Sequence, residues 1–158
     1  MDIEELNNEE TAHEISELFA KKEFHKIKNI LIEINPTDIA AIFDELPKEQ
    51  MLLLFRLLPK EEAAETFVEL DGDMQEALIT AFSDTELKEV IDELYLDDTV
   101  DIIEEMPANV VARIIKSADA ETRKQINQIL KYPKDSAGSI MTTEYVYLHR
   151  SYTAKEAL

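Results

Sequence analysis

The feature that most constrains the fold is a repeat of twelve residues that runs through the middle of the chain. One position of the repeat, followed along the chain, reads Pro47, Pro59, Asp71, Ser83, Tyr95, Pro107 and Asp119. Proline interrupts a helix, and aspartate and serine are favoured immediately before one. The spacing therefore predicts a series of short helices separated by tight turns.

Apolar residues keep the same register in each repeat. The position four residues before the interrupting one holds Phe43, Phe55, Phe67, Ile79, Ile91, Ile103 and Ile115. The positions one and five residues before it are also apolar in most repeats, and residues at these offsets share one face of a helix. A helix of about eight to ten residues is predicted in each repeat, because a twelve-residue unit with a turn leaves no room for more.

Helices this short are not stable alone in water, so they must bury their apolar faces against one another. We therefore predict an all-α fold, a superhelical solenoid of short helices with a repeat of about 12 residues. Residues 10–21 and 23–34 predict a longer N-terminal helix pair that caps the open end of the solenoid. The pattern leaves open how the helices pair and which hand the superhelix has.

The character of the sequence changes after Leu130. Residues 132–139 contain proline, glycine and serine and predict a linker, and Glu144–Leu148 is rich in residues that favour strands. Residues 151–158 begin like a capped helix and then stop. We predict a helical domain over residues 1–131, a linker over 132–139, and the truncated start of a second, α/β domain over 140–158, belonging to a longer parent chain.

The net charge restricts the classes of partner. The chain has 35 acidic and 16 basic residues, a formal charge of −19. Nucleic acids and anionic lipid surfaces both require basic residues, so neither is expected to bind. Divalent cations and basic proteins are the natural complements, although an acidic surface also serves simply to keep a protein soluble. The apolar runs, such as residues 51–55, are far shorter than a membrane span.

Motifs of catalysis are missing from the sequence. The chain has no cysteine and only two glycines, which excludes thiolate metal sites, a cysteine nucleophile and the usual glycine-rich phosphate loop. Its three histidines lack the spacing of a zinc site. We predict that the domain is not an enzyme.

Three carboxylates have two interpretations. Asp97 and Asp101 are four residues apart, on one face of a helix near its N-terminus, and Glu65 lies in an earlier repeat. In one interpretation Asp97 and Asp98 cap a helix while Asp101 and Glu65 are solvated. In the other, their oxygens bind a hard cation such as Mg²⁺, which keeps several waters and often uses one or two protein carboxylates. The spacing leaves both interpretations open.

A family resemblance follows from the junction at residues 135–146, which reads Asp-Ser-Ala-Gly-Ser-Ile-Met-Thr-Thr-Glu-Tyr-Val. This segment resembles the passage from the N-terminal domain into the first CBS domain of MgtE-family magnesium channels and transporters. Residues 35–40, 57–65 and 93–98 also resemble the N-terminal domain of that family, so the resemblance covers nearly the whole chain. It implies a helical superhelix followed by the truncated start of an α/β CBS domain.

The resemblance also implies a function. Family members are homodimeric membrane channels in which Mg²⁺ bound between the N-terminal domain, the CBS domains and a plug helix holds the closed state. It implies that Glu65, Asp97 and Asp101 contact regulatory Mg²⁺, with partner acids outside this chain, so occupancy in the isolated chain is expected to be weak. Mg²⁺ would also be the transported ion, and the domain would lie at the cytoplasmic face of the cell membrane. The alternative is an acidic helical-repeat scaffold that binds a protein without sensing an ion.

Overall fold

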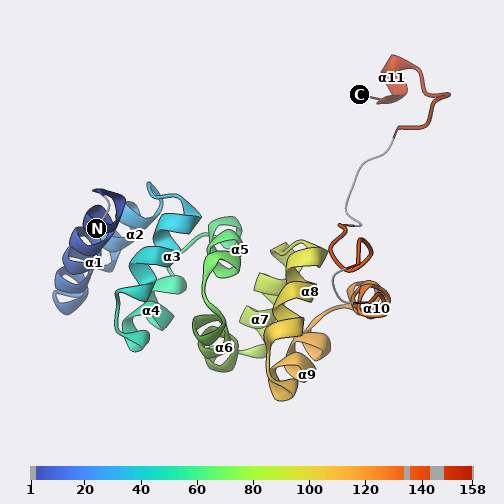
Figure 1. Ribbon diagram of the computed structural model, residues 1–158. Coiled ribbons are helices and arrows are strands. Elements are labelled where there is room, and N and C mark those ends of the chain that lie inside the picture. The colour runs from blue at the N-terminus through green and yellow to red at the C-terminus, as the bar shows by residue number, and fades with distance from the viewer. Residues whose placement is uncertain (1–2, 134–135, 143–147, 158) are drawn as a thin grey trace.

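The computed structural model describes residues 3–133, 136–142 and 148–157, and its regular structure over these residues is helical throughout (Figure 1). The all-α prediction is therefore confirmed for the described residues. The helices are α1 (Ile3–Ala20), α2 (Phe24–Leu31), α3 (Pro36–Asp44), α4 (Lys48–Phe55), α5 (Lys60–Glu69), α6 (Gly72–Ala81), α7 (Asp84–Glu93), α8 (Leu96–Glu105), α9 (Ala108–Ser117), α10 (Ala120–Ile129) and α11 (Ala154–Ala157).

The interrupting residues of the repeat separate these helices as predicted. Asp71, Ser83 and Asp119 precede α6, α7 and α10, and each side chain accepts a hydrogen bond from the backbone N–H three residues later, over 2.7, 3.2 and 2.8 Å. Such caps satisfy N–H groups that the helix itself leaves without a partner. Pro47, Pro59 and Pro107 precede α4, α5 and α9. Tyr95 precedes α8 and makes no side-chain cap.

The structure decides how the helices pair. From α1 to α9 each odd-numbered helix packs on the next odd one, which forms a continuous row (Figure 1). The second row is made of two separate pairs, α4 with α6 and α8 with α10. The end of α6 is close to α9, whereas α6 and α8 barely meet. The solenoid therefore has one continuous row and one interrupted row.

The predicted apolar register forms the core. Phe43, Phe55, Phe67, Ile79, Ile91 and Ile103 are all at most 6% exposed, and Ile115 is partly buried against the same core. Burial of one such side chain stabilises a fold by about 1.5–3 kcal/mol. The ring of Phe55 joins neighbouring repeats, because its centroid lies 6.3 Å from that of Phe67 and 5.6 Å from that of Phe82.

The prediction of a longer N-terminal helix pair is wrong for its second member. The first helix is 18 residues long and begins at Ile3, earlier than predicted, but α2 has only 8 residues. Lys22, with a φ of 59°, ends the first helix in the left-handed region. The second stops at Leu31 because Pro36 restricts the chain before it and Asn35 already caps α3, its Oδ1 accepting from Asp38 N–H over 3.0 Å.

The C-terminal predictions are tested only in part. Residues 136–139 form turns, in which Ser139 N–H donates to the Ser136 carbonyl over 3.0 Å. The predicted strand Glu144–Leu148 falls outside the described residues except for Leu148. The α/β start over 140–158 is thus not confirmed, and the division at 131 and 139 stays a prediction. Among the described helices, none combines the length and apolar character needed to cross a membrane.

Candidate functional site

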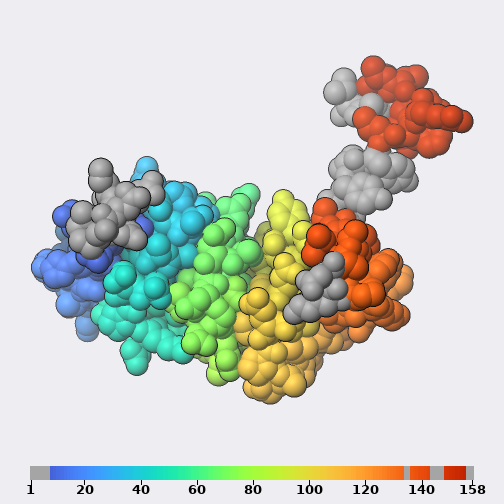
Figure 2. Space-filling view, viewed as in Figure 1, coloured from blue at the N-terminus to red at the C-terminus, as the bar shows by residue number. Residues whose placement is uncertain are grey.

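An acidic groove opens where the second row is interrupted, between α5 and α8. Figure 2 shows a notch between the green residues of α5 and the yellow residues of α8. Two adjoining cavities of about 350 and 280 Å³ lie there and share Val68 and Asp98 in their walls. We define the acidic groove by the residues that line these two cavities: Glu61, Ala64, Glu65, Val68, Leu70, Asp71, Gly72, Gln75, Glu93, Leu94, Tyr95, Asp98, Asp101, Ile102 and Glu105.

The groove carries negative charge without positive charge of its own. Its lining contains seven carboxylates and no lysine or arginine. Within the described part of the chain, no ion pair joins Glu61, Glu65 or Glu93 to another residue. The groove therefore has an uncompensated negative potential that favours a cation.

Glu65 lies on α5 and points outward, since its neighbours Ala64 and Thr66 are buried at 3% and 0% exposure. It lines the larger cavity together with Asp98 and Tyr95. The repeat explains this placement, because the residues on either side of Glu65 form the buried face of α5 and leave Glu65 on the outer face. Glu65 is thus an exposed carboxylate on one wall of the groove.

Asp97 and Asp101 lie one turn apart on α8, the helix on the opposite side of the groove, but only Asp101 is among the residues that line it. Partial burial, together with the charges of Glu104, Asp97 and Glu105, raises the pKa of Asp101 above its usual value. One oxygen of Asp97, Oδ1, is buried and has no hydrogen-bond partner among the described residues. Both observations show that negative charge on this helix is poorly compensated.

The capping interpretation of Asp97 does not fit this geometry. Tyr95 occupies the position before α8, and Asp97 lies inside the first turn of the helix. An unpartnered carboxylate oxygen at such a position costs free energy unless water or a cation meets it.

The three candidate residues are not gathered into one cluster. Across the groove Glu65 faces Asp98, whereas Asp101 lines the second cavity with Asp98. No group of three or more His, Cys, Asp or Glu side chains in the described part of the chain is close enough to hold a metal ion. A cation here would therefore meet at most two of these carboxylates at once, with water or other groups as its remaining ligands.

Sequence reasoning assigned Asp98 only a capping role and did not place it in the candidate cation site, although it lines both cavities, as Val68 does. Asp98 is three residues before Asp101, a spacing that places two side chains side by side on a helix. That spacing was the available signal. The approach of α5 toward α8, which makes Asp98 a neighbour of Glu65, has no signal in the sequence.

A third cavity, of about 180 Å³ between α4, α5 and α7, provides a comparison. Its two carboxylates are both paired: Glu86 lies 2.7 Å from Arg56 and Glu89 lies 3.3 Å from Lys60. The hydrogen bond from Arg56, followed by those from Ser83, lowers the pKa of Glu86 to about 2. Basic residues therefore lie beside the acids of this cavity, whereas no lysine or arginine is among the residues that line the acidic groove.

Comparison with known proteins identifies relatives of this fold. The magnesium transporter MgtE of Bacillus subtilis is 24% identical over 156 residues, which are 99% of this chain and 35% of the relative. The magnesium transporter MgtE of Thermus thermophilus is 32% identical over 154 residues, 95% of this chain and 34% of the relative. The chain thus spans about a third of the length of these relatives.

A solved structure and a family model agree with these relatives. The crystal structure of the cytosolic domain of the Mg²⁺ channel MgtE in complex with ATP matches with a TM-score of 0.75 and 32% identity, over 85% of this chain and 56% of that one. The model of the MgtE intracellular N domain family matches residues 34–135, well over half of the chain. These matches confirm the resemblance read from the sequence, and the chain belongs to the MgtE intracellular N domain family.

Proposed function

We propose that this chain is a cytoplasmic regulatory domain of a magnesium channel or transporter and that it gates transport by binding intracellular Mg²⁺ at acidic interfaces. The partners are the CBS domains and plug helix of the same protein, with a second copy in a homodimer, at the cytoplasmic face of the cell membrane. Mg²⁺ is both the regulatory and the transported ion, and the domain has no enzymatic role. Family membership and the acidic groove support this proposal.

The observation that carries the proposal is the uncompensated charge of the groove. Glu65, Asp97 and Asp101 offer carboxylate oxygens, the ligands that Mg²⁺ prefers. The buried Oδ1 of Asp97 and the raised pKa of Asp101 indicate that a cation at α8 would stabilise the folded domain. The residues present therefore fit a hard cation.

The spacing of these carboxylates makes the sites depend on a partner surface. Since no three described acids converge, Mg²⁺ would be held jointly by this domain and by acids on the surface that docks against it. Without the ion, two acidic surfaces repel each other. An ion that binds only the docked arrangement shifts the population toward it, which couples Mg²⁺ concentration to domain closure.

Limited proteolysis of the full-length parent protein across a Mg²⁺ titration tests the proposal. We expect millimolar Mg²⁺ to protect residues 132–139, and monovalent salt of equal ionic strength to leave them accessible. Glu65→Gln, Asp97→Asn and Asp101→Asn should each raise the Mg²⁺ concentration needed for protection. Asp92→Asn is the matched control, since Asp92 pairs with Lys88 away from the groove. An unchanged midpoint in all three variants would remove these site assignments.

A second candidate function rests on Tyr95. This side chain is 65% exposed and lines the groove beside Glu61, Glu65 and Glu93. An arginine of a basic protein would stack on the ring and pair with the carboxylates, as an acidic interaction scaffold requires. Chemical-shift titration with an arginine-rich peptide would then show binding that Tyr95→Ala abolishes and Tyr132→Ala preserves. Equal binding by both variants would exclude this role for Tyr95.

A further inference from the structure

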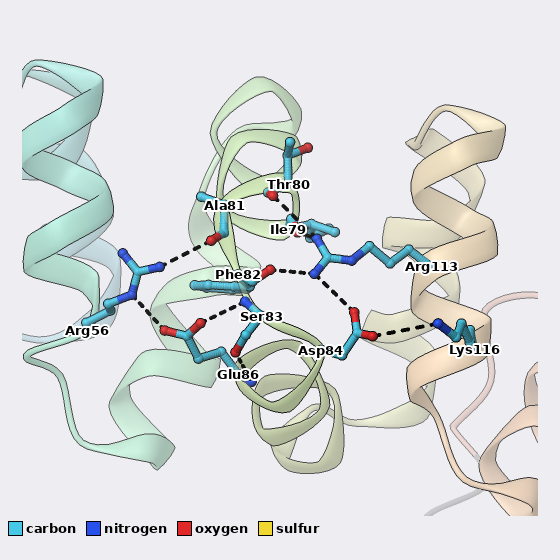
Figure 3. Close-up of polar contacts among 10 residues, drawn as sticks. All are labelled: Arg56, Ile79, Thr80, Ala81, Phe82, Ser83, Asp84, Glu86, Arg113 and Lys116. Carbon is cyan, nitrogen blue, oxygen red and sulfur yellow. Dashed lines mark hydrogen bonds and ion pairs between the residues drawn. The ribbon is translucent and has the colours of Figure 1, made fainter.

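We infer that Arg56 and Arg113 are positioning residues that fix helix α6 and, through it, the width of the acidic groove. Figure 3 shows the two guanidinium groups on either side of the turn that joins α6 to α7. We call these two residues the arginine clamp. The functional consequence rests on the proposed function, whereas the structural claim stands on the contacts below.

Arg113 reaches the turn from α9. Its guanidinium donates hydrogen bonds to the carbonyl oxygens of Ile79 and Phe82, with a longer one of 3.4 Å to Thr80. Its Nη2 also lies 3.3 Å from Asp84 Oδ1, in the first turn of α7. The side chain is 27% exposed, so these contacts are partly shielded from water.

Arg56 reaches the same turn from the end of α4. Its Nη2 donates to the Ala81 carbonyl over 3.2 Å, and its Nε donates to Glu86 Oε1 over 2.7 Å. The other oxygen of Glu86 accepts from Ser83 N–H over 2.7 Å, which completes the capping box of α7. Arg56 therefore contacts both the last residue of α6 and the first turn of α7.

The end of α6 needs these donors. A helix leaves its last four carbonyl groups without intrahelical partners and carries partial negative charge there. No basic residue lies in the last turn of α6, so the positive charge comes from α4 on one side and α9 on the other. The planar guanidinium, with five donors, serves several acceptors at once, which a lysine ammonium cannot match in geometry.

The opposite end of α6 forms a wall of the groove. Asp71, Gly72 and Gln75 line the second cavity opposite Asp98 and Asp101. The helix α6 has fewer contacts with α8 than with α4 and α9, so its position depends more on those two helices. A ten-residue helix is about 15 Å long, so a small tilt at the clamped end moves the wall at the other end. The arginine clamp thus sets the separation of α6 from α8.

Spin labels on the two walls measure this separation directly. The chain contains no cysteine, so Asp73→Cys on α6 and Glu104→Cys on α8 give a single labelled pair. Double electron–electron resonance on the labelled chain should give one narrow distance distribution. In Arg56→Met/Arg113→Met we expect a broader distribution whose mean moves by about 2 Å, the scale of helix shifts at packed interfaces. Circular dichroism checks that the helices persist.

Two further variants separate positioning from general stability. Lys116→Met removes only the outer ion pair with Asp84, 3.6 Å long, and should leave the distribution unchanged. Arg113→Lys keeps the positive charge but loses the planar guanidinium. The mean distance between the spin labels should therefore fall between those of the parent chain and the double variant.

A double variant that retains its helices and the parent distance distribution would overturn the inference. If the double variant does not fold, Arg113→Lys decides: a shifted or broadened distribution supports the clamp, and an unchanged one refutes it. No magnesium is present in these measurements, so their outcome is independent of whether the domain senses Mg²⁺.

Discussion

Arg113 donates a hydrogen bond to the carbonyl oxygen of Phe82, 31 residues earlier in the chain, and so ties α9 to the end of α6. The same guanidinium serves Ile79 and pairs with Asp84. One side chain therefore joins the helices α6, α7 and α9. This relationship gives the turn between α6 and α7 hydrogen bonds from helices on both sides and leads to the first prediction.

Arg113→Met should destabilise the domain by about 1.5–3 kcal/mol, the net value of hydrogen bonds to a charged group. Methionine keeps most of the apolar length and helix propensity of the side chain, so the loss reports on the guanidinium. Urea unfolding followed by circular dichroism measures it. Lys116→Met is the control, because Lys116 is 78% exposed and, among the described residues, pairs only with Asp84. An Arg113→Met variant as stable as Lys116→Met would contradict the prediction.

Glu86 should make stability depend on pH in the acidic range. Its pKa in the folded domain is about 2, against an ordinary value of 4.5, so its charge stabilises the fold above pH 4.5 and that contribution disappears as the pH falls toward 2. Because the side chain is 36% exposed, screening reduces the contribution to about 1 kcal/mol.

The measurement is the difference in unfolding free energy between the parent chain and Glu86→Gln as a function of pH. We expect the parent chain to be more stable by a constant amount from pH 7 to about pH 5, and the difference to shrink below that range. Other carboxylates titrate equally in both chains and cancel. A difference that stays constant down to pH 2 would show that Arg56 does not stabilise the Glu86 carboxylate.

Asp101 should behave in the opposite sense. Its folded pKa lies above the unfolded value, so the charged form destabilises the fold at neutral pH, and stability is regained as the pH falls through the raised pKa. Asp101→Asn is therefore expected to stabilise the isolated chain at pH 7 by up to about 0.5 kcal/mol, the range of surface substitutions. Thermal unfolding without divalent ions tests this, and a destabilised Asp101→Asn variant would contradict it.

Two buried threonines should respond to replacement by valine with stability changes of opposite sign. Thr66 is 0% exposed and its hydroxyl has no hydrogen-bond partner among the described residues, whereas the Thr99 hydroxyl, 1% exposed, donates to the Tyr95 carbonyl over 3.1 Å. Thr66→Val replaces the unsatisfied hydroxyl with a methyl group in a side chain of nearly the same shape. It should stabilise the domain by about 1 kcal/mol.

Thr99→Val removes a hydrogen bond that also supports the uncapped start of α8, and it should destabilise the domain by about 1 kcal/mol. Chemical denaturation of both variants and the parent chain, under one set of conditions, measures the two differences. If both substitutions changed the free energy of unfolding in the same direction, the hydrogen bonding of each hydroxyl would not explain their effects.

The extent of most helices could be predicted because helix ends are decided locally. Ser83 begins α7 through its own side chain, and Pro107 begins α9 through its fixed backbone. The apolar positions from Phe43 to Ile103 predicted the core for the same reason. Apolar residues at these spacings share one face of their helix, and that face is buried whichever helix packs against it. The length of α2 was mispredicted because its apolar pattern continues to Ile34, past the point where Asn35 and Pro36 already begin the next helix.

The candidate site was predictable only one residue at a time. Asp97 and Asp101 share a helix face by spacing alone, but the neighbour of Glu65 across the groove is Asp98, and that depends on how α5 and α8 pack. The gap between α6 and α8 and the reach of Arg113 to Phe82 also join residues far apart in the chain.

For this protein the sequence by itself determined the type, length and buried face of each repeated helix, because backbone propensity, capping and side-chain periodicity act within a few residues. Only the tertiary structure decided which helices stack, where the second row is interrupted, and which acids share the groove. Those outcomes depend on how whole helices pack against one another across the solenoid. Such packing joins residues far apart in the chain and leaves no local sequence pattern.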